Sequence, residues 1–304
     1  MRQPILIIGS LNMDMVIDMQ RMPLKSETVM GRSLSYIPGG KGANQAFAVG
    51  MMGGRAAMLG CVGGDSLGRQ LKENIQKSGT SAEGIAEREH SHTGIATIYV
   101  DDEGANSIVV VPGANSDCDV AYLKAHDDMI RACAYVVLQM EIPCDAIYYA
   151  VARAKELGKT VVLNPAPAPE SIPQEILAQV DYLTPNETEV ARLTGQKDLS
   201  MESILTGAHA LLAQGVQHVL VTLGDKGALL VDAKGETHFP ARKVSAVDTT
   251  AAGDCFNGAF VVGLSEGMDH AQAIRLANMA SSIAVTRKGA QTSIPTRQEV
   301  DALL

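Results

Sequence analysis

The chain has 304 residues, 46% of them hydrophobic, and carries a formal net charge of -9 at pH 7. Such an acidic protein repels nucleic acid and anionic lipid, so we expect neither as a partner. No apolar run approaches the ~20 residues that a bilayer requires, and the first residues lack the pattern of a signal peptide. The five cysteines are scattered without a C-x-x-C pair, which argues against a disulfide framework or a cysteine metal site and favours a reducing, cytoplasmic location.

Short apolar runs alternate with amphipathic stretches along most of the chain. We expect helices at 147–158 and 206–215, where apolar residues recur at helical spacing. Buried strands are expected at residues 5–9, 56–60, 135–139, 160–164, 181–185 and 218–223. Continuous apolar strands separated by helices are typical of a parallel sheet covered on both faces.

Two segments interrupt this alternation. The first contains DMVIDMQ and TVMGRSLSYIP with polar turns between them, and the second, residues 93–111, reads as a hairpin around DDEGAN. Both alternate in hydropathy, as a half-exposed antiparallel sheet does. We therefore expect a small β lid, residues 12–38 and 92–111, inserted into an α/β body of residues 1–11, 39–91 and 112–304.

Polar side chains follow several predicted strands, at the edge where open parallel sheets bind their ligands. Asn12 and Asp14 stand at alternate positions after the first strand, so on an extended chain they point the same way and can grip vicinal hydroxyls. The alternative is an Asx turn that leaves the strand. Glu141 follows the strand at 135–139 and is a weaker candidate, because surface glutamates are common.

Two more loops allow both a structural and a functional interpretation. In TPNETEV, residues 184–190, Asn186 and Glu189 open a helix. They either cap it or handle phosphate and Mg²⁺ through water. The stretch VTLGDKG, residues 221–227, carries two glycines after a strand and either cradles a nucleotide or turns into the strand ALLV.

The segment PGGKGANQAFAVG, residues 38–50, has three glycines within four positions around Lys41, and a helical pattern follows with Asn44 in its first turn. Glycine here allows a close approach of the backbone to a ligand, whereas a plain turn is the alternative. It is not a Walker A loop, because Ser35 stands where the first glycine is required, and the G-x-G-x-x-G spacing is also missing.

The segment DTTAAGDCFNGAF, residues 248–260, leads from small residues into a single carboxylate, Asp254. A helix predicted from about Asp254 carries Phe256, Phe260 and Leu264 on one buried face. Its amino terminus offers unpaired N–H groups and a positive dipole end, which favours an ionised Asp254 by roughly 0.3–1 kcal/mol. A carboxylate ready to accept a proton beside a cradle for phosphate charge suits phosphoryl transfer. The alternative is an ordinary capping aspartate.

GGKGANQA and DTTAAGD together resemble the two signature regions of the ribokinase family of carbohydrate kinases, also called the phosphofructokinase-B family. GSLNMD, LNPAPA, TPNETE, VTLGDKGALL and VTRKGAQTSIP extend the resemblance, in order, over essentially the whole chain. It implies a ribokinase-like three-layer α/β fold, with a mostly parallel central sheet flanked by helices and a β lid that also clasps a homodimer. The implied activity is ATP-dependent phosphorylation of the 5-hydroxyl of D-ribose.

The resemblance also implies roles for individual residues. Asp254 is the expected base, and the backbone of Ala251, Ala252, Gly253 and Asp254 is the expected anion hole. The sugar is expected at Asn12, Asp14, Gly40, Lys41, Asn44, Glu141 and Asp254. ATP is expected at Asn186, Thr222, Gly224, Asp225, Gly227, Gly253 and Asn278, with Glu189 supporting Mg²⁺ through water. A K⁺ ion is expected at Asp248, Thr250, Ala284, Arg287, Gly289 and Ser293, mostly through backbone oxygens.

Two residues beside the expected base are unusual. Many family members have glycine where Ala251 stands, and a methyl group there restricts the backbone without forbidding the anion hole. Cys255 at a helix amino terminus is either a thiol of lowered pKa or simply a small buried residue.

The charges of the expected sugar site indicate the class of substrate. Its acids, Asp14, Glu141 and Asp254, oppose the single cation of Lys41, so a neutral polyol fits better than a sugar phosphate, which requires Arg or Lys. The sequence leaves open 2-deoxyribose or a nucleoside as the substrate, and a sugar sensor without turnover. A nicotinamide dehydrogenase is disfavoured because the dinucleotide fingerprint is missing.

Overall fold

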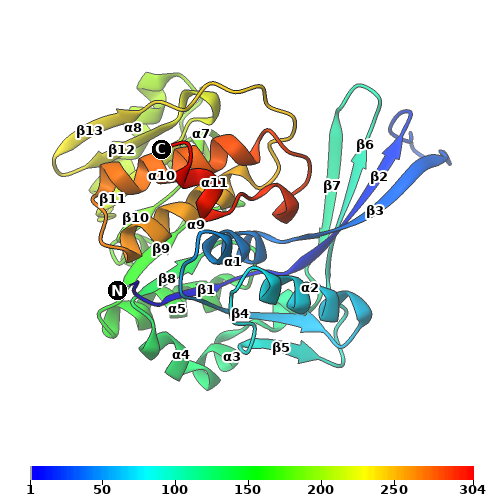
Figure 1. The fold of residues 1–304 in the computed structure, drawn as a ribbon, viewed down its shortest axis with the longest axis horizontal. Coiled ribbons are helices and arrows are strands. Elements are labelled where there is room, and N and C mark those ends of the chain that lie inside the picture. The colour runs from blue at the N-terminus through cyan, green and yellow to red at the C-terminus, as the bar shows by residue number, and fades with distance from the viewer. Residues whose placement is uncertain (1) are drawn as a thin grey trace.

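The protein is described by a computed structural model that covers residues 2–304. Within these residues a nine-stranded sheet forms the centre of the molecule and a separate four-stranded sheet projects from it (Figure 1). The strands of the large sheet, in spatial order, are β13 (Gly235–Phe239), β12 (Ala228–Asp232), β11 (His218–Thr222), β10 (Tyr182–Leu183), β9 (Thr160–Leu163), β8 (Tyr135–Leu138), β1 (Ile5–Ile8), β4 (Ala56–Gly63) and β5 (Ile85–Arg88).

The large sheet is mostly parallel, as predicted. From β11 to β5 every pairing is parallel, and only β12 runs against its two neighbours. All six strands expected from apolar runs are present. The edge strands β5 and β13 were not expected, because IAER and GETHF are short and largely polar.

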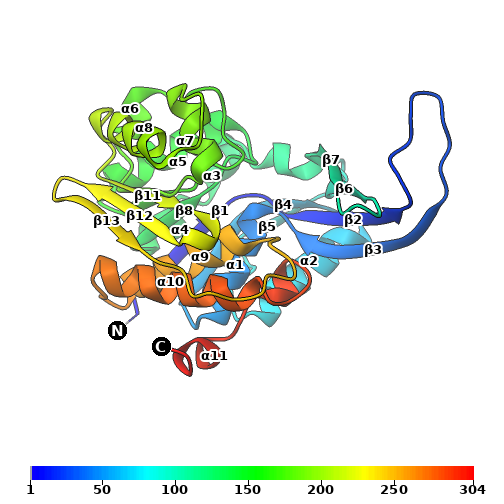
Figure 2. The same ribbon diagram turned by 90° about the horizontal axis from the view of Figure 1, so that it is seen from above.

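Helices cover both faces of this sheet, which gives the three layers (Figure 2). One face carries α1 (Lys41–Met51), α2 (Ser66–Lys77), α9 (Ala252–Ser265), α10 (His270–Ala284) and α11 (Arg297–Asp301). The other carries α3 (Val120–Ala125), α4 (Asp127–Ala132), α5 (Cys144–Glu156), α6 (Gln174–Leu177), α7 (Glu187–Thr194) and α8 (Met201–Ala213). Strand residues alternate between the two cores, for example Ile5 and Ile7 in one and Leu6 and Ile8 in the other. The three-layer fold is therefore confirmed.

The second sheet has the order β3 (Gly31–Gly39), β2 (Asn12–Met19), β6 (Gly94–Val100) and β7 (Asn106–Val111). β2 with β3 and β6 with β7 are antiparallel hairpins, whereas β2 pairs with β6 in parallel, so the sheet is mixed rather than purely antiparallel. The sheet extends away from the body in both views (Figures 1 and 2).

Three short 3-10 helices complete the part of the chain that the structure describes: η1 (Gly113–Asp117), η2 (Gly224–Lys226) and η3 (Gln291–Ser293). Between residues 2 and 304, no helix has the length and apolarity needed to cross a membrane. Ile8, Leu138, Leu163 and Leu183 are register partners at the ends of neighbouring parallel strands, so the loops that follow them meet at one edge of the sheet.

Candidate active site

The glycine-rich start of α1 docks onto the loop after β1. Gly40 has a φ of 90°, and a Cβ there would lie 2.7 Å from the backbone nitrogen of Asn12. A Cβ on Gly42 would lie 2.5 Å from the nitrogen of Ser10. These glycines thus approach the protein's own backbone, and by doing so they bring Lys41 beside Asn12.

Glu141 joins the loop after β8 to this glycine-rich turn. Its Oε2 accepts hydrogen bonds from Ser10 Oγ at 2.6 Å and from the backbone nitrogen of Lys41 at 3.0 Å. Asn12 Oδ1 accepts from Asn115 Nδ2 at 2.8 Å, which fixes the orientation of its amide. Asn12 and Glu141 also border a cavity of about 390 Å³ that reaches the end of the second sheet at Val110.

The charged groups expected to hold the sugar do lie close together. Burial, followed by the fields of Glu141 and Asp254, raises the pKa of Asp14 to about 7. Burial lowers the pKa of Lys41, but the fields of Asp254, Glu141 and Glu189 outweigh it, so the net pKa is raised and the ammonium is retained. Three carboxyl groups thus lie close to one lysine that keeps its charge.

Asp254 is buried, with 6% of its surface exposed, and both of its oxygens accept hydrogen bonds from amides of α1. Asn44 Nδ2 donates to Oδ2 at 3.0 Å, and Gln45 Nε2 donates to Oδ1 at 3.0 Å. Gln45 Nε2 also donates to Asn164 Oδ1 at 3.1 Å, and Asn164 Nδ2 donates to the carbonyl of Thr184 at 2.8 Å. Since a carbonyl only accepts, this chain of amides holds Oδ1 of Asp254 as an acceptor.

The first turn of α9 presents unpaired backbone donors next to this carboxylate. Within residues 2–304 the N–H groups of Ala251, Gly253 and Asp254 have no hydrogen-bond partner, whereas that of Ala252 donates to Thr249 O at 3.2 Å. All four residues line a cavity of about 200 Å³, together with Lys41, Asn186, Glu189 and Thr222. Exposed N–H groups at a helix amino terminus suit a phosphate.

Ala251 caps α9 in the left-handed region, with a φ of 57°. This conformation explains why glycine suits the position, since a Cβ costs roughly 1–2 kcal/mol there. The helix begins at Ala252, two residues before the predicted start, and Phe256, Phe260 and Leu264 are buried as predicted. Cys255 is fully buried and burial raises its pKa to about 12, so it is the small core residue and not an activated thiol.

Asn186 and Thr222, which are expected at the nucleotide, line this cavity from the ends of β10 and β11. Asn186 caps α7: its Oδ1 accepts from the nitrogen of Glu189, and Glu189 Oε2 accepts from the nitrogen of Asn186, each at 2.8 Å. The structural interpretation of this pair therefore holds, and both residues still line the cavity. Thr222 ends β11 and forms a backbone bridge with Asn186.

The remaining nucleotide residues gather around the end of β13. Gly224 and Asp225 lie in η2, next to Gly227. Asn278 Nδ2, on α10, donates to the carbonyl of Phe239 at 3.2 Å, and Phe239 pairs with Ala228. These four residues are thus near one another but do not line the cavity at Asp254.

Oxygen donors lie where the two metal ions are expected. Glu189 has one carboxylate oxygen without a hydrogen bond within residues 2–304, and carboxylate oxygens suit Mg²⁺. Asp248 Oδ2 accepts from Gly289 N at 2.9 Å and its Oδ1 from Thr250 N at 2.9 Å, so the structure brings together the two segments expected at K⁺. Burial raises the pKa of Asp248, but these hydrogen bonds outweigh it and keep the group ionised.

The other residues expected at K⁺ lie on the segment that these bonds hold in place. Ala284 ends α10, and the carbonyl of the next residue, Val285, accepts from Val247 N at 2.7 Å. Arg287 forms an ion pair with Glu299, and Ser293 Oγ donates to the carbonyl of Ala290. Carbonyl oxygens near Asp248 suit a hard monovalent cation.

Several polar residues of the site were not singled out from the sequence. Gln139 Nε2 donates to Gln45 Oε1 at 2.7 Å, and Gln291 Nε2 donates to Asn44 Oδ1 at 3.1 Å, so both residues orient the amides that hold Asp254. Gln139 and Asn164 could have been identified from the sequence, since each is an amide at the end of an apolar strand. No sequence pattern marks Gln291.

Comparisons with known proteins agree with this arrangement. A family model described as "pfkB family carbohydrate kinase" matches residues 2–297. A ribokinase of Haemophilus influenzae is 39% identical over 300 residues, covering 98% of this chain and 97% of the relative. A deoxyribokinase of Salmonella typhi is 32% identical over 300 residues, covering 99% and 98%. The structure of an Arabidopsis thaliana ribokinase complexed with ribose and ATP superposes with a TM-score of 0.93 at 32% identity, covering 100% of this chain and 99% of that one.

Proposed function

Because the chain belongs to the pfkB family of carbohydrate kinases, we propose that it transfers the γ-phosphoryl group of ATP to the 5-hydroxyl of D-ribose. The products are D-ribose 5-phosphate and ADP. Full-length relatives named ribokinase, at 39% identity, support this substrate. The observation that carries the proposal is the buried Asp254 carboxylate, held as an acceptor by Gln45 and Asn44, beside unpaired N–H groups of α9.

In this proposal Asp254 takes the proton of the 5-hydroxyl as its oxygen attacks the γ-phosphorus, and the bond from that phosphorus to the bridging oxygen of ADP breaks. The N–H groups of Gly253 and Asp254 stabilise the negative charge of the transferring group. Lys41, whose ammonium is retained by the surrounding acids, adds a positive charge at the same cavity. A bound Mg²⁺, supported by Glu189, supplies further neutralisation of phosphate charge.

The sugar lies between the start of β2 and Glu141. The side chains of Asn12 and Asp14 point to the same side of β2, and Asp14 accepts hydrogen bonds from the vicinal hydroxyls of the sugar. An acid of pKa about 7 next to two other carboxylates disfavours a further negative charge, which speaks against a sugar phosphate as the substrate. A site built to bond a hydroxyl discriminates against its absence by as much as ~10⁴, which favours ribose over 2-deoxyribose.

A monovalent cation, K⁺, would be held at the loops tied together by Asp248 and Gly289, where it would keep the neighbouring anion hole in place. This role is supported by the hydrogen bonds that bring Asp248, Thr250 and Gly289 together. Nothing in the chemistry of these donors requires a divalent ion.

The second sheet, residues 12–38 and 92–111, acts as the lid over the sugar and as the interface of a homodimer. Six large apolar side chains of its edge strands are at least 44% exposed, which is unusual for a monomer surface: Leu34, Tyr36, Ile108, Val109, Val110 and Val111. β7 is exposed along its whole length, and such an open edge tends to be covered.

A comparison of ADP release with ribose, 2-deoxyribose, fructose and adenosine tests the proposed substrate. Ribose is expected to give the highest kcat/KM. The 32% identity to a deoxyribokinase makes 2-deoxyribose the specific alternative, and a higher kcat/KM for that sugar would replace our assignment.

A further inference from the structure

Three potential metal ligands meet at the edge of the large sheet opposite to Asp254. His218 is the first residue of β11, Asp232 is the last of β12, and the two are direct partners in the antiparallel register. His270 is the first residue of α10. One ligand atom from each of the three lies within 4.8 Å of the others. Since Thr222, at the other end of β11, borders the catalytic cavity, the cluster is separated from it by the length of the strand.

Two of these side chains already have the outer hydrogen bonds that orient metal ligands. His218 Nδ1 lies 3.1 Å from the carbonyl oxygen of Asp181, which only accepts, so Nδ1 carries the proton and Nε2 presents a lone pair. Asp232 Oδ1 accepts from the backbone nitrogen of Lys234 at 2.7 Å. The lone pair of His218 Nε2 then faces Asp232 Oδ2 at 4.0 Å. A cation placed between these two acceptors would bind both of them.

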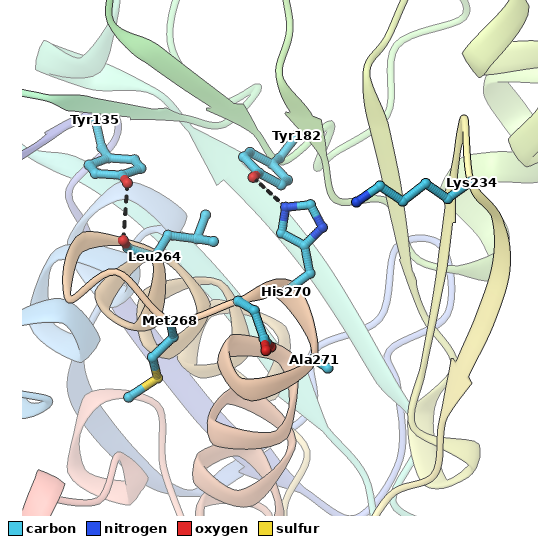
Figure 3. A pocket seen from close by; sticks show the side chains of 8 residues that line it. Tyr135, Tyr182, Lys234, Leu264, Met268, His270 and Ala271 are labelled. Atoms are coloured by element: carbon cyan, nitrogen blue, oxygen red, sulfur yellow. Dashed lines mark hydrogen bonds between the residues drawn. The ribbon is translucent and has the colours of Figure 1, made fainter.

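His270 completes the set. Its Nε2 lies 2.9 Å from the hydroxyl of Tyr182, an interaction drawn in Figure 3. A hydrogen bond on one ring nitrogen is the usual companion of metal ligation through the other.

We infer that His218, Asp232 and His270 bind a divalent transition metal ion, with Zn²⁺ as the best match. Two imidazoles and one carboxylate are typical Zn²⁺ ligands, and bond lengths of ~2.0–2.2 Å place ligand atoms about 3.3 Å apart. His218 Nε2 and Asp232 Oδ2 are 4.0 Å apart and no pair of ligand atoms exceeds 4.8 Å, so the three groups need to converge by about 0.7–1.5 Å. The side chains of His218 and Asp232 are 21% and 9% exposed. A water completes the tetrahedron.

An adjacent pocket gives the ion a path from solvent. It has a volume of about 470 Å³ and is lined by Tyr182, Lys234, Asp269 and His270, among others. Figure 3 shows Lys234 reaching toward His270, so its positive charge opposes the ion until the side chain moves aside. A bound ion links α10 to β11 and β12, which stabilises the folded protein by mass action.

Metal titration of the full-length protein tests this site directly. Bound metal is first removed from the protein with EDTA. Excess Mg²⁺ is then added without nucleotide, so that Mg²⁺ rather than Zn²⁺ occupies the carboxylates of the catalytic cavity. Zn²⁺ binding is measured by titration calorimetry. Co²⁺ is then used as a spectroscopic probe. We expect one Zn²⁺ per chain, a raised Tm on binding, and a tetrahedral Co²⁺ spectrum without a thiolate charge-transfer band.

Variants distinguish a built site from adventitious binding. His218→Ala and Asp232→Asn are expected to abolish this binding event, and His209→Ala, which removes an exposed histidine that contacts Glu236, is expected to leave it unchanged. Tyr182→Phe keeps the ring but removes the partner of His270, which typically weakens affinity 10–100-fold. Lys234→Ala is expected to tighten binding.

Equal Zn²⁺ affinity in the wild type and in His218→Ala would overturn the inference. So would a Co²⁺ spectrum with thiolate bands, or the absence of any stoichiometric Zn²⁺ binding. If His218→Ala loses both Zn²⁺ binding and its fold, Tyr182→Phe and Lys234→Ala decide the question. The first is expected to weaken Zn²⁺ affinity and the second to strengthen it, and reduced stability does not produce shifts of opposite sign. Unchanged affinity in both variants would also overturn the inference.

Discussion

The substitution Asp254→Asn removes the proposed base while preserving the shape of the side chain. In the wild type, the carbonyl of Thr184 fixes the orientation of the Asn164 amide, which in turn fixes that of Gln45. Gln45 then donates to Oδ1 of Asp254. The new amide therefore keeps its oxygen toward Gln45 and turns its NH₂ toward Asn44. Two donors then meet, and a buried donor without an acceptor costs ~1–3 kcal/mol.

We therefore expect Asp254→Asn to lose no more than about 3 kcal/mol of unfolding free energy, because the rest of the network is intact. Turnover is expected to fall by roughly 10²–10⁴, the usual contribution of a general base. Steady-state ADP release and thermal unfolding measured on the same preparation separate the two effects. Cys255→Ala, a buried neighbour that touches neither substrate nor base in this account, is the matched control. Near-wild-type turnover in a folded Asp254→Asn protein would refute the role of this carboxylate.

Three further predictions concern pH, potassium and assembly. The raised pKa of Asp14 means that the folded state binds a proton more tightly than the unfolded state, so stability falls as pH rises from about 4 to about 7. Asp14→Asn is expected to flatten this pH dependence and, above pH 7, to raise the free energy of unfolding by at most about 4 kcal/mol relative to the wild type. An unchanged pH dependence in the variant contradicts the raised pKa of Asp14. Replacing K⁺ by a large organic cation is expected to slow the wild type, and Asp248→Asn to abolish that difference; equal rates in both salts count against the site. Light scattering is expected to give twice 32.0 kDa, and Ile108→Glu to give the monomer mass; a monomeric wild type rejects the dimer.

The fold was largely readable from the sequence because its strands are buried on both faces. Runs such as ILII and TVVL have few alternatives to a central parallel strand. β5 and β13 were not predicted because they are edge strands. An edge strand pairs with one neighbour and carries polar residues, as in GETHF, so it lacks the apolar run of a central strand. The parallel pairing of β2 with β6 was also not predicted, since it joins segments about 80 residues apart that share no local signal.

The candidate site was only partly predictable for a related reason. Asp254, Lys41 and Glu141 were found because each follows a strand or opens a helix, and such ends meet at one edge of the sheet. The amides of Gln139 and Gln291 act through partners that are distant in sequence, 94 residues away for Gln139 and Gln45. The glycines near Lys41 were expected either to approach a ligand or to form a turn, and their close approach to Ser10 and Asn12 is revealed only by the packing of α1.

We propose that this chain phosphorylates a neutral pentose at its terminal hydroxyl. Phosphorus NMR of the product formed from ATP and D-ribose identifies the oxygen that receives the phosphoryl group. We expect a new phosphate-ester signal split by both protons of C5, formed in step with ADP. A signal split by a single proton, which marks phosphorylation at a ring carbon, would contradict it, as would ADP release without any sugar phosphate.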